Sequence, residues 1–388
     1  MKVFQVLSGG AWGGGAVVVL AITRALINRG DEVWVLCLDE GVASRFRAAG
    51  ATVVTSPLWF HPINPLDVAP FAQLYALCVR ERFDLVATHT SKGGFLGRLA
   101  ARLAGTPHIV HHAHGFAFRE CNSWAVRRFY IALERLASGY CDSIISVSED
   151  HRQGAIREGV ASADQIKTVL NGIDLLPFRE TNRTAMRRAF GFREDDVVLC
   201  VGSRLAPKKG LEYLMAAMPA VIARHPSVHL VLFGEGPLQV ELLRQAEQLG
   251  ISRHIHFPGF RKDIPQLLGG FDVVLQPSLS EGLSISILEA MAAGRPIIAC
   301  DIQGNREVIR HGKNGLLVPP ANAAALAEAI VRILSDPALA KTMGEEAARD
   351  CRTRFSQDRM VDETLAVYDR VCRSEVSEAI EPEELIRL

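Results

Sequence analysis

The chain of 388 residues is longer than one ordinary hydrophobic core supports, and its length indicates about two domains. Lysine plus arginine and aspartate plus glutamate each total 43, so no excess charge favours nucleic acid as a partner. Eight cysteines lie far apart without a Cys-x-x-Cys pair, which is typical of reduced thiols in the cytoplasm and argues against a disulfide framework.

The first half of the chain predicts alternating strands and helices. Val3–Leu7 reads as a strand rather than a signal peptide, and a helix over 16–29 follows a glycine-rich turn. That turn lacks Gly-x-Gly-x-x-Gly spacing, so a nicotinamide dinucleotide site is a weak interpretation. Its glycines permit close approach of a ligand, or simply supply positive φ angles. The further strands expected in this half are Val33–Leu38, Asp84–His89, His108–His112, Ser143–Val147 and Ile166–Leu170.

A polar stretch over about 175–195 reads as a linker, after which the alternation restarts. We therefore predict an α/β protein of two Rossmann-like, doubly wound domains that face a cleft. The first covers 1–180 and is completed by the C-terminal segment 356–388; the second covers 190–355. The strands expected in the second domain are Val197–Val201, Val228–Phe233, His254–Phe257, Asp272–Gln276, Pro296–Cys300 and Gly315–Val318.

Two glutamates, Glu281 and Glu289, stand eight residues apart around a predicted helix start. A strand precedes Glu281, so both carboxylates are expected at the carboxyl edge of a parallel sheet, where α/β proteins bind ligands. Carboxylates accept hydroxyl donors, and the start of a helix near Leu283 accepts phosphate oxygens. A sugar nucleotide offers both groups. The alternative is a solvated helix face.

A basic loop follows the first strand of the second domain. Arg204 can grip a diphosphate as a two-donor fork and Lys209 as a point charge. A solvated basic loop is the alternative. The segment Asn171–Asp174 ends the last strand of the first domain, and its Asn-Gly pair is equally an ordinary turn.

Histidines close two first-domain strands. His112 and His114 share a strand face, but no carboxylate or cysteine completes a zinc site at ligand spacing, so a metal is disfavoured. His114 can instead donate a hydrogen bond to a sugar hydroxyl or carbonyl, whereas His111 and His112 fit packed or solvent-facing positions better. The segment Thr88–Gly94 suits an anionic acceptor or an ordinary helix cap.

Two predicted helices mix basic and apolar residues. Arg98 and Arg102 lie in the first, over 92–103, and Arg127 and Arg128 lie in the second, over 124–135. Such a mixture suits an anionic membrane surface or a core face with a solvated basic edge. No apolar run approaches the roughly 18–20 residues that span a bilayer. We expect a cytoplasmic protein, with peripheral attachment to the inner face of the plasma membrane as an open alternative.

Together these motifs resemble glycosyltransferase family 4, the retaining enzymes of GT-B fold, and in particular the bacterial enzymes of exopolysaccharide, capsule and O-antigen assembly. The resemblance extends along nearly the whole chain. It rests on the order and spacing of Glu281-x7-Glu289, Gly202…Arg204…Lys209-Gly210, Asn171-Gly-Ile-Asp174, the glycine-rich first loop, Thr88–Gly94 and His114-Gly-Phe116.

The resemblance implies that Arg204 and Lys209 hold a donor diphosphate and that Glu289 holds ribose hydroxyls. Glu281 and His114 would lie at the reacting centre. The catalytic residues would be His114, Glu281, Arg204 and Lys209. The other donor contacts that it implies are Gly14, Gly15, Asn171, Phe260, Arg261, Gly282, Leu283 and Ser284. The acceptor residues that it suggests are His89, Ser91 and Lys92.

The implied reaction moves a sugar from a nucleoside diphosphate, with UDP as the expected form, to a hydroxyl of a polyprenyl-diphosphate-linked or other glycan acceptor. The anomeric configuration would be kept. The resemblance implies no cofactor and no metal, and the chain lacks an Asp-x-Asp motif. Ser284 departs from the proline common in this subgroup, which leaves sugar recognition open. A sugar-nucleotide 2-epimerase and a non-catalytic sugar-nucleotide-binding scaffold are the alternatives.

Overall fold

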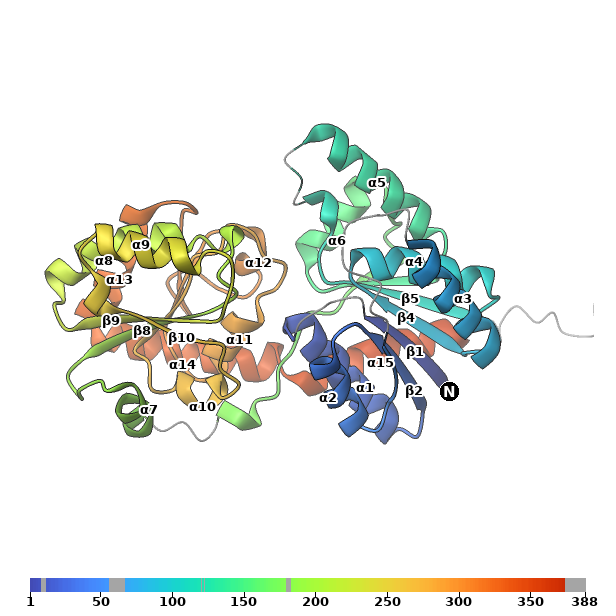
Figure 1. The fold of residues 1–388 in the computed structure, drawn as a ribbon, viewed down its shortest axis with the longest axis horizontal. Coiled ribbons are helices and arrows are strands. Elements are labelled where there is room, and N and C mark those ends of the chain that lie inside the picture. Colours follow the sequence, from blue (N-terminus) through green and yellow to red (C-terminus); the bar gives the residue numbers. More distant parts are fainter. Residues whose placement is uncertain (8–11, 56–66, 120, 122, 179–182, 374–388) are drawn as a thin grey trace, which may run out of the picture. The chain divides into compact units, whose positions relative to one another are not determined.

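The computed structural model describes residues 1–7, 12–55, 67–119, 121, 123–178 and 183–373. The chain forms two compact units, of which the first contains residues 1–171 and 358–388 and the second contains residues 172–357 (Figure 1). None of the described helices is both long enough and apolar enough to cross a bilayer.

The first unit is built on a parallel sheet with the strand order β3-β2-β1-β4-β5-β6-β7. Its strands are β1 (Lys2–Leu7), β2 (Glu32–Cys37), β3 (Thr52–Thr55), β4 (Leu85–His89), β5 (His108–Ala113), β6 (Ser143–Ser146) and β7 (Ile166–Thr168). Its helices are α1 (Gly14–Asn28), α2 (Glu40–Ala48), α3 (Val68–Glu81), α4 (Ser91–Leu103), α5 (Trp124–Ser138), α6 (Glu149–Arg157) and α15 (Gln357–Arg373).

Side chains of the central strands alternate between two covered faces of this sheet. On one face Phe4 and Val6 of β1 join the apolar cluster formed with α3, α4 and α6. On the other face lies α15, which returns from the end of the chain: the Tyr368 hydroxyl lies 2.7 Å from Nε2 of His112 in β5. The last described helix therefore completes the packing of the first sheet.

The second unit has a parallel sheet with the order β10-β9-β8-β11-β12-β13. Its strands are β8 (Val197–Gly202), β9 (Val228–Phe233), β10 (Ile255–Gly259), β11 (Val273–Gln276), β12 (Ile297–Cys300) and β13 (Leu316–Val318). Its helices are α7 (Arg183–Phe190), α8 (Leu211–Arg224), α9 (Gln239–Gln248), α10 (Ile264–Leu268), α11 (Ile285–Ala292), α12 (Gln303–Arg306), α13 (Ala323–Ser335) and α14 (Pro337–Arg354).

Helices cover both faces of the second sheet (Figure 1). The apolar faces of α8, α9 and α13 form one large core with the strands, while α11 packs on α14. The prediction of two doubly wound α/β domains is confirmed, and each expected strand is found with ends at most two residues away. The sequence pattern misses β3, a strand of four residues at the sheet edge.

The expected linker over 175–195 is wrong over 183–190, where the chain forms α7. The reason is tertiary. Arg187 of this helix is buried and donates to the carboxylate of Asp272 at 2.9 Å and to the carbonyl of Asp196 at 2.6 Å. Met186 fills the space beside Gly270. A locally polar segment is thus fixed to the sheet by two side chains.

Candidate functional site

The residues predicted to bind the diphosphate and the sugar gather at the carboxyl edge of the second sheet. Arg204 and Lys209 lie in the loop after β8, and Glu281 lies in the loop between β11 and α11. Strands β8 and β11 are hydrogen-bonded neighbours, so their loops emerge side by side. The crossing from strand to helix at this edge is where parallel α/β sheets bind ligands.

Lys209 and Glu281 form an ion pair within this edge. The Oε1 atom of Glu281 that pairs with Nζ of Lys209 also accepts a hydrogen bond of 3.1 Å from Nε2 of Gln276. Gln276 is the last residue of β11 and is 1% exposed. Gln276 belongs to none of the motifs identified in the sequence, although a polar residue at the end of an apolar strand is a signal for such a position.

Gly210 allows the basic loop to reach Glu281. Its φ is +61°, and a Cβ at this position would lie 2.2 Å from the carbonyl oxygen of Pro277. Beside it, the amide of Leu279 donates to the carbonyl of Lys208 at 2.8 Å. Only a glycine fits this conformation without strain, and the resulting backbone contact holds Lys209 against the β11–α11 loop.

The start of α11 is fixed at the same edge. Ser286 Oγ donates to the carbonyl of Gly202, the last residue of β8, at 2.6 Å. Ser284 is the N-cap and makes no side-chain cap bond, so the first-turn N–H groups of the helix have no side-chain acceptor there. Leu283 and Ser284 are buried, and Gly282 is partly exposed. The helix thus presents backbone donors and its positive dipole end beside Glu281.

Glu289 lies in the second turn of α11, as predicted. Burial raises the pKa of its carboxyl to about 7. At neutral pH this carboxyl is therefore partly protonated, and hydroxyl donors would favour its ionised form, because each hydrogen bond to a carboxylate stabilises the charge. This environment is suited to a ligand that brings hydroxyl groups.

Arg204 lies in the loop after β8, and Phe260 and Arg261 lie in the loop after β10, at the same edge of the sheet. The side chain of Arg204 is exposed, and the structure gives its guanidinium no partner within the described residues. Phe260 is 51% exposed. Arg261 pairs with Asp263, Nε to Oδ1 2.8 Å, and lies over the ring of Phe190 at 5.6 Å. An exposed ring and a flat cation next to each other suit contact with a planar base.

In the first unit, His114 follows β5 at the carboxyl edge and is partly exposed. A Cβ on Gly15, at the start of α1, would lie 4.0 Å from its ring. Gly14 begins the same helix. The part of the glycine-rich turn at residues 8–11 lies outside the described residues.

His89 is fully buried, with Nε2 2.7 Å from Oε1 of Gln5 and Nδ1 3.2 Å from Nε2 of His114. Both ring nitrogens are therefore engaged inside the protein and are not open to an acceptor. Ser91 and Lys92 begin α4 and are partly exposed, and Lys92 pairs with Asp67.

His111 and His112 are buried, as their packed interpretation predicts. Nδ1 of His111 lies 2.9 Å from Oγ1 of Thr88. Burial lowers the pKa of His112 to about 3 and that of His114 to about 4, so both rings are neutral at physiological pH.

Within the described residues, no group of three or more His, Cys, Asp or Glu side chains is placed to hold a metal ion. Asn171, the last residue of the first segment of this unit, is also buried.

Arg98 does not belong to a basic surface. It is fully buried, donates from Nη2 to Glu134 of α5 at 2.9 Å and from Nε to the carbonyl of Gly94 at 2.8 Å. The surface-exposed cations of these two helices are instead Arg102, Arg128 and Arg135. The prediction of Arg98 as part of a membrane-facing basic edge is therefore wrong, because its charge is neutralised in the core.

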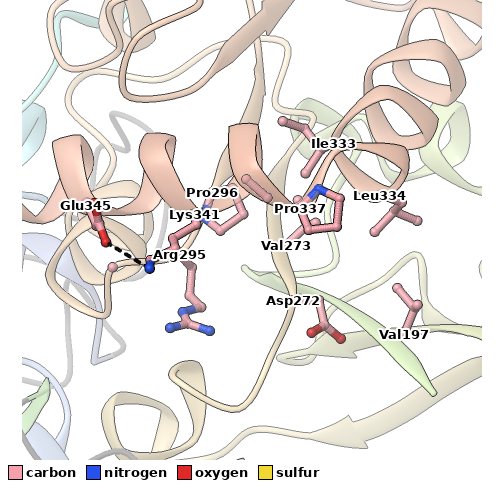
Figure 2. Close-up of a pocket in the computed structure, with 12 residues that line it drawn as sticks. Val197, Asp272, Val273, Arg295, Pro296, Ile333, Leu334, Pro337, Lys341 and Glu345 are labelled. Atoms are coloured by element: carbon pink, nitrogen blue, oxygen red, sulfur yellow. Dashed lines mark ion pairs between the residues drawn. The ribbon is translucent and has the colours of Figure 1, made fainter. Parts of the chain in front are cut away.

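A hollow of about 480 Å³ lies elsewhere on the second unit (Figure 2). Val197, Asp272 and Pro296 lie at the amino ends of β8, β11 and β12, and Arg295 and Lys341 also line the hollow. It contains none of the predicted site residues. Since ligands of parallel sheets bind at the carboxyl ends of the strands, this hollow is not the candidate site.

Comparison with known proteins gives consistent family matches to both halves of the chain. Residues 12–175 match the family model described as Glycosyltransferase Family 4, and residues 182–350 match Glycosyl transferases group 1. The putative glycosyltransferase EpsD of Bacillus subtilis is 34% identical over 320 residues, which cover 80% of this chain and 83% of that protein. The UDP-Gal:alpha-D-GlcNAc-diphosphoundecaprenol alpha-1,3-galactosyltransferase of Escherichia coli is 30% identical over 353 residues, covering 88% and 90%.

Solved structures show the same fold. Anabaena Alr3699/HepE in complex with UDP-glucose is similar with a TM-score of 0.81 and 25% identity, covering 95% of this chain and 100% of that one. WaaG, a glycosyltransferase involved in lipopolysaccharide biosynthesis, is similar in fold with a TM-score of 0.77 and 18% identity, covering 93% and 99%.

Proposed function

This chain belongs to the family 4 glycosyltransferases of GT-B fold, and we propose that it transfers a sugar from a UDP-sugar to a lipid-linked glycan acceptor with retention of the anomeric configuration. The observation that carries the proposal is the ligand set at one edge of the second sheet. There Arg204 and Lys209 supply positive charge. Beside the start of α11, Glu281 and Glu289 supply carboxylates that accept hydrogen bonds from sugar hydroxyl groups.

The two cations act on the leaving group. When the bond from sugar to diphosphate breaks, the diphosphate oxygen gains negative charge, and a fixed positive environment stabilises that charge more than the charge of the intact donor. We assign this role to Arg204, Lys209 and the amides at the start of α11, in a reaction that needs no metal. Glu281 then orients the donor sugar and Glu289 the ribose.

Two comparisons support the substrates. The Anabaena structure is a complex with UDP-glucose, and the Escherichia coli relative is named for transfer of galactose from UDP-Gal to a diphosphoundecaprenol-linked sugar. For this chain, UDP as the nucleotide and a polyprenyl-diphosphate-linked glycan as the acceptor follow as proposals. Phe260 and Arg261 are the residues that we assign to the base, and Ser91 and Lys92 those that we assign to the anionic part of the acceptor.

The test is a donor screen. The full chain is incubated with a panel of UDP- and GDP-sugars, with and without undecaprenyl-diphosphate-linked GlcNAc, and released nucleotide is measured. We expect one or a few donors to release UDP, and the release to increase when the acceptor is added. NMR of the product should show that the transferred sugar has the same anomeric configuration as in the donor. Tight donor binding without nucleotide release from any donor would contradict the proposal.

We also propose that α5 rests on an anionic membrane, as a lipid-linked acceptor requires. Trp124 is 74% exposed, Phe129 55% and Leu136 53%, and the same helix carries the exposed cation Arg128. The guanidinium of Arg128 lies 5.7 Å from the ring centre of Trp124. Exposed aromatic rings mixed with cations suit the interface of a bilayer on the cytoplasmic side.

Sedimentation with vesicles tests the membrane contact. The chain is expected to pellet with phosphatidylglycerol-containing vesicles at low salt and less with phosphatidylcholine vesicles. Replacement of Trp124 and Phe129 by serine should reduce pelleting several-fold. Absence of binding to anionic vesicles at low salt would contradict it.

A further inference from the structure

We propose that Gln5 and His89 fix the tautomer of His114, so that His114 presents an unprotonated Nδ1 to a hydroxyl group of the substrate. The inference rests on the proposed function, and on the place beside the reacting sugar that the family resemblance implies for His114. Gln5 and His89 are thereby positioning residues for the transfer, which act through His114 and touch no substrate.

The three side chains form a hydrogen-bonded row across neighbouring strands. β1 pairs with β4, and β4 pairs with β5, with His89 directly opposite His112. Gln5 and His89 are both 0% exposed, and His114 follows the end of β5. The row therefore runs from the buried centre of the sheet to its partly exposed carboxyl edge.

The direction of each hydrogen bond follows from the chemistry of Gln5. Its Oε1 atom is an amide oxygen and only accepts, so Nε2 of His89, 2.7 Å away, carries the proton. His89 is neutral, because burial and the three neighbouring histidines lower its pKa well below the ordinary value. A neutral imidazole with a proton on Nε2 has a lone pair on Nδ1.

That lone pair decides the state of His114. Nδ1 of His89 lies 3.2 Å from Nε2 of His114, so Nε2 of His114 must carry the proton that this hydrogen bond uses. His114 is neutral as well, since burial lowers its pKa to about 4. Its Nδ1 is then unprotonated, and the structure gives this atom no partner within the described residues.

The consequence concerns the substrate. A hydroxyl group can donate or accept, so the tautomer of His114 decides which of the two it does. With Nδ1 unprotonated, the hydroxyl donates its hydrogen to His114, which is the reverse of the direction expected from the sequence, and its oxygen lone pairs point away from the ring. The row thus orients one hydroxyl of the substrate in a single direction.

A second contact keeps the row in place. The ring of His112 lies 4.5 Å from that of His89, and Nε2 of His112 is bonded to the hydroxyl of Tyr368 at 2.7 Å. Tyr368 comes from α15, the helix that returns from the end of the chain. Tyr368 thus holds the ring of His112, which packs against the ring of His89.

The direct test is NMR of the ring nitrogens in the full chain labelled with ¹⁵N-histidine. The signals of His114 are assigned by their loss in His114→Gln. We expect a protonated Nε2 and an unprotonated Nδ1 in the wild type, and a mixture of the two tautomers in Gln5→Leu and in His89→Phe. A protonated Nδ1 in the wild type, or an unchanged tautomer in both variants, would overturn the proposal.

The kinetic test separates positioning from simple structural support. His89→Phe should lower kcat about three- to tenfold, the effect of one hydrogen bond, while the donor KM changes less than about twofold. His89→Gln, whose amide oxygen can accept from Nε2–H of His114, should restore part of the loss. An unchanged kcat in His89→Phe, or no recovery in His89→Gln, would overturn it.

Ser143→Ala is the matched control. It removes the 3.2 Å hydrogen bond from Oγ of Ser143 to the carbonyl of Gln165, which lies at the amino end of β6 in the same sheet. It should lower thermal stability without altering kcat. If the wild type transfers no sugar at all, the proposed function fails, while the NMR result still decides the tautomer.

Discussion

Gln276 and Glu281 share a hydrogen bond of 3.1 Å, and the carboxylate oxygen that accepts it is the one that Lys209 also contacts. The side chains of Lys209 and Glu281 are 16% and 14% exposed. Lys209, which we assign to the diphosphate, is thus held in place by Glu281, which we assign to the donor sugar. Binding of the donor would give Lys209 a second anion and leave Glu281 oriented by Gln276.

Lys209→Ala should lower kcat/KM at least a hundredfold, because it removes a fixed charge that stabilises the leaving group. The measurement is the rate of UDP release with the preferred donor. Lys208→Ala removes the same charge one position earlier, from an exposed side chain, and should change kcat/KM less than about threefold. Equal losses in the two variants would show that only the overall charge of the loop matters.

Arg204→Lys tests whether the guanidinium binds the diphosphate with two donors. A lysine keeps the charge but loses the planar fork, so we expect about a tenfold rise in the donor KM, and a larger rise in Arg204→Ala. Calorimetric titration with UDP gives the same comparison without turnover. A lysine variant that binds UDP as tightly as the wild type would contradict the two-donor geometry.

Glu289 predicts a pH dependence. Its folded-state pKa of about 7 lies above its ordinary value of 4.5, so the folded chain binds this proton more tightly than the unfolded chain. Its contribution to stability is complete below about pH 4.5 and is lost as the pH rises through about 7, by up to about 3 kcal/mol. Urea unfolding at pH 5 and pH 8 should show this difference in the wild type and a smaller one in Glu289→Gln.

The same group predicts that UDP binds more tightly as the pH rises through about 7, since the carboxylate is the better acceptor for ribose hydroxyls. Glu289→Gln should bind UDP more weakly than the wild type at pH 8, and its affinity should depend less on pH. A pH profile of UDP affinity that is identical in both chains would remove Glu289 from the ribose contact.

Glu134→Ala should destabilise the first unit by about 3–5 kcal/mol, because it leaves the fully buried guanidinium of Arg98 without its carboxylate. The free energy of unfolding in urea measures the loss. The double variant Arg98→Met with Glu134→Leu removes both charges and should recover most of it. A double variant as unstable as Glu134→Ala would show that packing, rather than the unpaired charge, sets the cost.

Much of the fold was predictable because it depends on local pattern. The strand over Val228–Phe233 has the bounds that its apolar spacing predicts, and the helices expected over 92–103 and 124–135 are found as α4 and α5. Glycines and helix starts likewise located Lys209, Glu281 and Glu289 on one sheet edge. Local pattern failed at α7, where a buried arginine, Arg187, is satisfied by partners far along the chain.

Contacts between distant residues were beyond the reach of the sequence. From the sequence, Arg98 is expected to be a surface cation and His89 to contact the acceptor substrate, yet both side chains are fully buried. Their partners, Glu134 and Gln5, lie 36 and 84 positions away. No spacing rule connects such pairs, since they meet only when the sheet has formed.

Residue periodicity and chain order were enough to predict the alternation of strands and helices, the two parallel sheets and the sheet edge that carries the charged site residues. The tertiary structure alone decided protonation and partnership: that Lys209 is paired with Glu281, that burial raises the pKa of Glu289 and lowers that of His114, and that Gln5 and His89 orient the ring of His114. The physical reason is that desolvation and hydrogen-bond direction depend on every neighbour in space, and most of those neighbours are remote in the chain.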